Sequence, residues 1–176
     1  FKGADHEGIR RKVSPFILRR TKEDVLTDLP AKYERIISAE MGEEQRKIYE
    51  AVKKEASDAL SFGGKAFDIL PYLTRLRQIC IDPGMYLESY GKSGAKMELL
   101  SSLIPSYIES GHRILVFSQF VKALESLKSV LTSKNIPTYM LTGDTSAKER
   151  ISLTNSFNEN QGVDVFLISL KAGGTG

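Results

Sequence analysis

Apolar residues recur at helical spacing in two segments of the first half of the chain. The two stripes are Ile48, Tyr49, Val52, Ala56 and Leu60, and then Ile69, Leu70, Leu73, Leu76 and Cys80. Gly63-Gly64 separates them, and Asp82-Pro83-Gly84 is a turn sequence that ends the second. We therefore expect two helices between residues 41 and 91.

The pattern changes after residue 92, where short apolar runs alternate with helical stripes. The runs are 114–117, 138–141 and 163–170, and the stripes lie at 100–108, 121–131 and 151–157. Ile114–Phe117 is apolar without alternation, which is typical of a strand covered on both faces. Pro105 is expected to kink or break the first stripe. Strands alternating with helices of this length predict βαβ units and a parallel sheet, and hence an α/β fold.

The first 40 residues have a different character. Between residues 10 and 22 the chain holds six basic residues and no acidic one: Arg10, Arg11, Lys12, Arg19, Arg20 and Lys22. This run is either a solvated basic helix or a contact for nucleic acid or an acidic protein. Leu29-Pro30 is a break, and Tyr33–Glu40 has the composition of a strand.

Composition excludes several classes of protein. The chain has 176 residues, 41% apolar and 27% charged, which is ordinary for a globular domain and unlike a fibrous or disordered protein. No apolar run approaches the ~20 residues that span a bilayer, and the first residues do not form a signal peptide. Cys80 is the single cysteine, which indicates a reducing compartment, and it is too far in sequence from His6 and His112 to suggest a zinc site. The net charge of +3 does not by itself imply a polyanionic partner.

Small and polar residues follow each predicted strand. The three segments are Ser118-Gln119-Phe120, Thr142-Gly143-Asp144-Thr145, and Ser169 to Gly176. Carboxyl ends of parallel strands meet at one sheet edge, and glycine and hydroxyl residues there let backbone N–H groups approach an anion. Each segment alone is weak evidence, because the first two suit ordinary turns and the third lacks the Gly-Lys-Ser/Thr of a P-loop. Together they predict an anion-binding edge.

Ordered blocks along nearly the whole chain resemble the SWI/SNF family of helicase-like, DNA-dependent ATPases in superfamily two. The blocks are Pro15–Val25 with Leu29–Glu34, Gln45–Tyr49, Leu76–Cys80 with Pro83, Ile114–Phe120 (similar to helicase motif IV), Thr142–Thr145 with Arg150 and Phe157, and Ser169–Gly176 (similar to motif V). One departure is Ile81-Asp82, where the family usually has Asn-His.

The resemblance implies a partial RecA-like lobe, with a parallel sheet flanked by helices and preceded by a helical insertion. Residues 1–40 would be the end of the first lobe or the inter-lobe linker, 41–91 the helical insertion, and 92–176 the N-terminal part of the second lobe. Because the chain stops at Gly176, directly after a predicted strand, we expect a truncated lobe with an exposed sheet edge that invites self-association.

The resemblance also implies site residues. Ser118, Gln119, Thr142, Gly143, Ser169 and Lys171 would line the surface that holds the DNA backbone. Gly174, Thr175 and Gly176 would face the nucleotide. No catalytic or metal-binding residue is expected in the chain. The basic run around Arg19-Arg20 would contact phosphate or pack within the linker.

The implied parent protein is an ATP hydrolase that uses ATP and Mg²⁺ and moves along double-stranded DNA, with the missing first lobe as partner and no membrane association. The isolated chain is expected neither to hydrolyse ATP nor to bind a cofactor tightly. The compact 41–91 region favours a bacterial cytoplasmic protein, and a eukaryotic source would make it nuclear. Two alternatives remain open: a protein-interaction module using the 41–91 helices, and a flavodoxin-like domain that binds a phosphorylated ligand.

Overall fold

The computed structural model describes residues 6–17, 32–61, 66–159 and 162–173. The chain divides into two units, 1–37 and 38–176. The described part of the first unit contains the helix α1 (His6–Val13) and the 3-10 turn η1 (Ser14–Phe16). The basic residues of α1 are exposed in its last turn, the end at which the helix dipole favours cations. Arg19, Arg20, Lys22 and Leu29-Pro30 lie outside the described residues.

The expected strand at Tyr33–Glu40 is wrong. Residues 32–42 form neither helix nor strand. The side chains of Tyr33 and Ile36 are 94% and 95% exposed, so no face of this segment is buried. A strand needs a neighbour that pairs its backbone groups, and no described strand lies alongside this segment.

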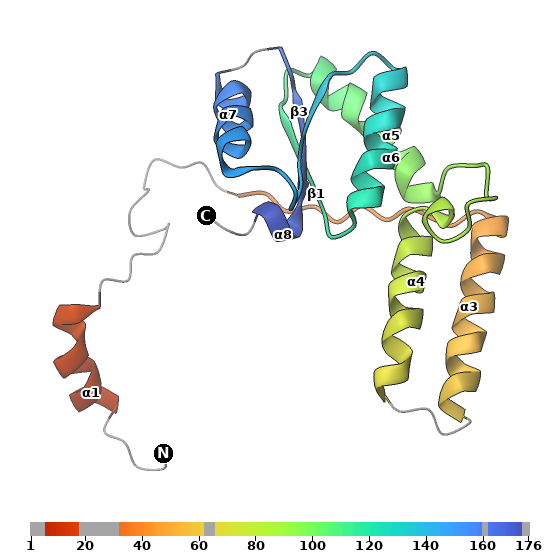
Figure 1. Ribbon diagram of the computed structural model, residues 1–176, viewed down its shortest axis with the longest axis horizontal. Coiled ribbons are helices and arrows are strands. Elements are labelled where there is room, and N and C mark those ends of the chain that lie inside the picture. Colours follow the sequence, from red (N-terminus) through yellow and green to blue (C-terminus); the bar gives the residue numbers. More distant parts are fainter. Residues whose placement is uncertain (1–5, 18–31, 62–65, 160–161, 174–176) are drawn as a thin grey trace. The chain divides into compact units, whose positions relative to one another are not determined.

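The two helices predicted between residues 41 and 91 are confirmed. They are α3 (Glu43–Ser61) and α4 (Leu70–Ile81), which pack side by side as a hairpin (Figure 1). A 3-10 turn, η2 (Ala66–Ile69), leads into α4, and Gly63-Gly64 lies outside the described residues. Asp82 ends α4 as predicted: its backbone is extended, and its side chain accepts a hydrogen bond from Gly84 N at 2.9 Å at the start of η3 (Pro83–Met85).

The helix α5 (Ala95–Glu109) runs through Pro105, so the expected break is wrong. Proline has no N–H group, which leaves the carbonyl of Ser101, four residues earlier, without its helical donor. Lys134 Nζ donates to that carbonyl oxygen at 2.6 Å. A side chain from a distant part of the chain thus replaces the hydrogen bond that the proline removes.

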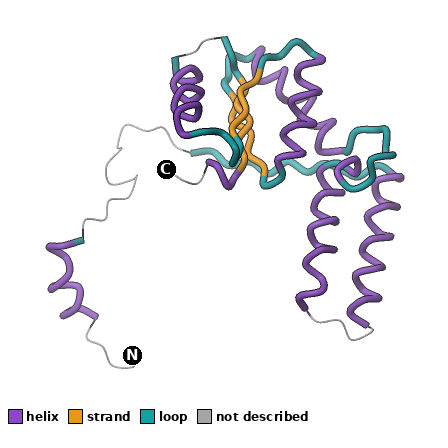
Figure 2. Tube along the Cα trace, viewed as in Figure 1, coloured by secondary structure: helices purple, strands orange, loops and turns teal. Residues whose placement is uncertain are grey.

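The predicted parallel sheet is confirmed. Its strands are β1 (Ile114–Ser118), β2 (Thr138–Leu141) and β3 (Val165–Ser169), in the spatial order β1-β3-β2, with both pairs parallel (Figure 2). The helix α6 (Val121–Ser133) connects β1 to β2, and α7 (Ala147–Asn158) connects β2 to β3. A short helix, α8 (Leu170–Gly173), follows β3. The described fold is therefore α/β.

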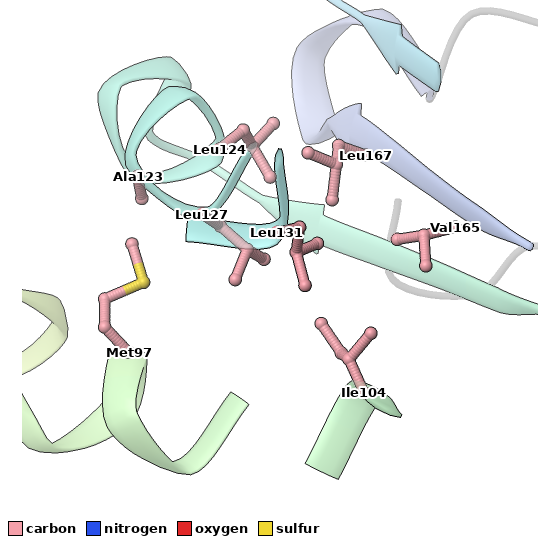
Figure 3. Close-up of a cluster of buried hydrophobic side chains, with 8 residues drawn as sticks. All are labelled: Met97, Ile104, Ala123, Leu124, Leu127, Leu131, Val165 and Leu167. Atoms are coloured by element: carbon pink, nitrogen blue, oxygen red, sulfur yellow. The ribbon is translucent and has the colours of Figure 1, made fainter. Parts of the chain in front are cut away.

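The main hydrophobic core lies between the sheet and the helices α5 and α6 (Figure 3). Its buried members are Met97, Ile104, Ala123, Leu124, Leu127, Leu131, Val165 and Leu167. On the other face, α7 and α8 cover β2 and β3 through Leu141, Phe157, Phe166, Ile168 and Ala172. The central strand β3 is consequently buried along its whole length.

β1 is covered on one face only, so the expectation of cover on both faces is wrong. Val116 is partly buried against the main core, whereas Leu115 and Phe117 are 50% and 51% exposed. These two side chains line a cavity of about 300 Å³ together with residues of β3 and α7. The physical reason is that α7 packs over β2, and among the described elements only the end of α8, at Gly173, comes close to Phe117 on this face of β1.

Candidate functional site

The three polar segments that follow the strands begin together at one edge of the sheet. Ser118 and Ser169 are register partners at the ends of β1 and β3. Leu141 pairs with Ile168, so Thr142 follows β2 level with Ser169. Since the described strands are all parallel, the three segments begin at the same edge of the sheet, as the sequence predicted.

The segment after β1 is a tight turn into α6. Ser118 is half-buried, and its hydroxyl accepts a hydrogen bond from the backbone N–H of Phe120 at 3.1 Å. This is the local side-chain-to-backbone bond by which serine stabilises turns. Gln119 lies between them and is exposed, so its amide is available to a ligand at this edge.

Two hydrogen bonds between threonines stabilise the turn after β2. Thr142 N donates to Thr145 Oγ1 at 3.0 Å, and Thr145 N donates back to the carbonyl of Thr142 at 3.3 Å. Gly143 is exposed, and a Cβ added there would meet nothing within 4 Å. Packing therefore does not require glycine at 143, and its backbone is open to close approach from solvent. Ser146 then caps α7 by accepting from Glu149 N at 3.3 Å.

The segment after β3 differs, because its first residue is buried. Ser169 is 3% exposed, whereas Lys171 in α8 is exposed. Gly173 lies close to the sheet: a Cβ at this residue would be 2.8 Å from Ile168 Cγ2 and 3.4 Å from Phe117 Cε1. Glycine thus lets the chain pass close over β1 and β3. Gly174, Thr175 and Gly176 lie outside the described residues.

Arg150 links α7 to the segment after β3, a contact that the sequence pattern did not reveal. Its guanidinium Nη1, on α7, donates to the carbonyl oxygen of Ala172 in α8. Arg150 is half-buried and Ala172 is buried. In the sequence Arg150 stood out only as part of the family resemblance, because a contact across 22 residues leaves no local signal.

The described residues do not fit a magnesium site. In the parts of the chain that the structure describes, no three His, Cys, Asp or Glu side chains converge as metal ligands. None of the described helices is long and apolar enough to span a membrane. The described edge offers backbone amides, hydroxyl groups and a lysine, which are groups that bind anions.

Two family models match the chain. The SNF2-related domain matches residues 5–85, and the helicase conserved C-terminal domain matches residues 95–176. Among curated proteins, an uncharacterized ATP-dependent helicase of Mycoplasma pneumoniae is 33% identical over 96% of the chain. The nuclear protein STH1/NPS1 of Saccharomyces cerevisiae is 29% identical, also over 96%. The chain spans only 16% and 14% of the lengths of these two relatives.

Solved structures agree with the family models. The SWI2/SNF2 ATPase core domain of Sulfolobus solfataricus superposes with a TM-score of 0.75 at 30% identity, covering 99% of this chain and 38% of that one. The same core in complex with dsDNA gives a TM-score of 0.72 at 28% identity, covering 96% and 38%. The α/β fold described above therefore matches the fold of that ATPase core.

Proposed function

The chain belongs to the SWI/SNF family of helicase-like ATPases, and we propose that it forms part of an ATP-dependent translocase on double-stranded DNA. Residues 1–40 would belong to the first lobe or the linker, 41–91 to a helical insertion, and 92–176 to the second lobe. The similarity to a SWI2/SNF2 ATPase core in complex with dsDNA supports duplex DNA as the substrate.

The single observation that carries the DNA-binding role is the shared edge of the strand ends, with Ser118 opposite Ser169 and Thr142 alongside. A motor that moves along any sequence must hold phosphates, because base contacts would make each register differ in energy. The accessible backbone of Gly143, the amide of Gln119 and the ammonium of Lys171 suit phosphate oxygens. Ser169 is 3% exposed, so its side chain is less accessible to a phosphate than these three groups.

The nucleotide role is assigned to Gly174, Thr175 and Gly176 by their similarity to motif V. Phosphoryl transfer needs a phosphate-binding lysine, a magnesium-holding acid and usually an arginine that stabilises the transition state. By the same family resemblance, the first lobe would supply the lysine and the magnesium-holding acid. The isolated chain would then bind nucleotide weakly and hydrolyse none.

Partners and compartment follow from the same proposal. The first lobe would be the physiological partner, and an exposed sheet edge, such as β1 in the described order β1-β3-β2, would permit non-physiological self-association. The relatives include a bacterial helicase and a yeast nuclear protein. We favour a bacterial cytoplasmic protein, and a eukaryotic source would make it nuclear.

The test is duplex binding by the 176-residue chain, measured by fluorescence anisotropy with two DNA sequences across a salt series. We expect similar affinity for both sequences and weaker binding by Lys171→Ala, with the log–log salt slope reduced by about one. Lys54→Ala, which removes an exposed lysine of α3, is the control and should bind as the wild type does. Failure to bind duplex DNA at low salt contradicts the DNA role, and DNA-stimulated release of phosphate from ATP contradicts the expected inactivity.

A protein-interaction module remains a second candidate, because the hairpin exposes apolar side chains. Phe67 is 79% exposed, and Leu70 and Leu73 are each 49% exposed. NMR titration separates the two functions. Duplex DNA should shift the amide signals of Thr142 and Lys171, and shifts confined to α3 and α4 on addition of a protein partner would favour the module. Tight mononucleotide binding without DNA would favour the flavodoxin-like alternative.

A further inference from the structure

A lysine occupies the second position of every helix that begins at or near the strand-end edge. The four lysines are Lys96 in α5, Lys122 in α6, Lys148 in α7 and Lys171 in α8. All four are exposed. Within the described residues none of them forms a hydrogen bond or an ion pair, whereas Lys53, Lys92 and Lys134 each have a partner.

The topology brings these positions to one edge of the sheet. The helices α6, α7 and α8 directly follow β1, β2 and β3, and Figure 1 shows them leaving the edge at which the strands end. The start of α5 reaches the same edge, because Lys96 lines a cavity of about 180 Å³ together with Phe117 and Ser118. Four segments that are far apart in the sequence thus each place one lysine near the strand ends.

This placement opposes local helix electrostatics. The N-terminal turn of a helix carries partial positive charge, so a lysine there is disfavoured and an acidic residue is favoured. The hairpin follows the rule with Glu43 and Glu44 in the first turn of α3. The first turn of α6 contains Lys122 and no acidic residue. In α5 and α7 the lysine is accompanied by an acidic residue of the same turn, Glu98 or Glu149, whereas Lys122 has none. A ligand of opposite charge at the edge would compensate for this unfavourable placement of Lys122.

We propose that Lys96, Lys122 and Lys148 extend the phosphate-binding surface beyond Lys171, forming a lysine row that holds the DNA backbone. This inference rests on the proposed function. Exposed lysine ammonium groups are mobile point charges, which suits contact with successive phosphates without reading bases. Each phosphate that such a group neutralises releases condensed counterions, so the row has a measurable signature in the salt dependence of binding.

Acidic side chains near the edge limit how basic it becomes. Glu98 follows Lys96 by two positions, which places it about 200° around α5. Asp144 is exposed in the turn after β2, and Glu149 follows Lys148 in α7. If duplex DNA lies along this edge, Asp144→Asn should tighten binding, because it removes a charge that repels phosphate.

The experiment compares two triple variants of the 176-residue chain that lose the same charge. The row variant is Lys96→Ala, Lys122→Ala and Lys148→Ala, and the control is Lys47→Ala, Lys54→Ala and Lys128→Ala, whose exposed lysines lie in α3 or further along α6. In duplex-DNA anisotropy, the row variant should lose about three from the log–log salt slope and bind at least roughly tenfold more weakly at 0.1 M salt. The control should stay within about twofold of the wild type.

The outcomes separate the inference from the proposed function. Wild-type-like binding by the row variant, together with weaker binding by Lys171→Ala, overturns the row and leaves the DNA-binding role intact. An equal loss in both triple variants also overturns it, because net charge alone would then explain the result. Absence of duplex binding by the wild type contradicts the proposed function itself. If the row variant folds poorly, the triple Lys→Gln variant decides, because glutamine removes the charge and keeps a polar side chain: a reduced slope and affinity support the row, and wild-type-like binding overturns it.

Discussion

The side-chain amide of Gln45 in α3 donates a hydrogen bond to the carbonyl oxygen of Ile79 in α4 at 2.7 Å. The same side chain accepts a hydrogen bond from the backbone N–H of Ala95, the first residue of α5, at 3.0 Å. Gly94 precedes α5 and has no side chain to cap it, so Gln45 serves as the cap from 50 residues away. One buried glutamine therefore joins the hairpin to the first helix of the sheet-bearing region.

Gln45→Leu should destabilise the chain. Leucine fills a similar volume but leaves the Ile79 carbonyl and the Ala95 N–H without their partner in a buried place, since Gln45 is 2% exposed. We expect a loss of about 1–3 kcal/mol in the free energy of unfolding, measured by urea denaturation. Arg46→Ala, at the exposed neighbouring position, is the control. A denaturation midpoint for Gln45→Leu equal to that of the control would show that the two hydrogen bonds of Gln45 do not contribute to stability.

Gly94→Ala should also destabilise, through steric overlap. A Cβ at residue 94 would lie 2.7 Å from both Asp82 Cα and the Ile81 carbonyl oxygen, and 2.9 Å from Pro83 Cδ. Two of these atoms are backbone, so relief requires movement of the turn that ends α4. We expect a cost of about 1–3 kcal/mol, seen as a lower melting temperature. Gly42→Ala is the matched control, because a Cβ there would meet nothing within 4 Å; equal melting of the two variants would refute the overlap.

Lys134→Ala should destabilise by an amount that depends on residue 105. In the wild type it removes the donor at the Ser101 carbonyl, with an expected cost of about 0.5–1 kcal/mol for this exposed contact. In a Pro105→Ala background the helix regains its own donor, so removing Lys134 should cost less. A double-mutant cycle by chemical denaturation measures the coupling. Additive effects of the two substitutions would mean that Lys134 does not compensate for the proline.

Arg150→Ala should loosen α8 relative to the sheet. The substitution removes the donor to the Ala172 carbonyl, and we expect faster amide exchange at residues 171–173, with little change in the central strand at Leu167. Hydrogen–deuterium exchange followed by NMR measures both. Ser152→Ala, at an exposed position of α7, controls for a general effect on that helix. Unchanged exchange in α8 would show that Arg150 does not hold it.

The local pattern of residues predicted a helix where an apolar stripe extended over several turns, and a strand where a short apolar run was clearly bounded by polar residues. The apolar stripes in 48–60 and 69–80 predicted α3 and α4 because a helix face repeats at 3.6 residues, and the alternation after residue 92 predicted the parallel sheet. The order of parallel strands then placed Ser118, Thr142 and Ser169 at one edge without further information.

What the sequence could not reveal depended on contacts between distant segments. Tyr33–Glu40 has strand composition but no described strand to pair with, and α5 survives Pro105 because Lys134 arrives from beyond α6. Which helix covers which strand likewise decides three other features. They are the exposed face of β1, the burial of Ser169 and the hydrogen bond from Arg150 to Ala172. The periodicity of a segment reflects which of its residues share one face, and this depends only on residues close together in the sequence. The tertiary structure decides which distant groups complete its hydrogen bonds and cover its faces.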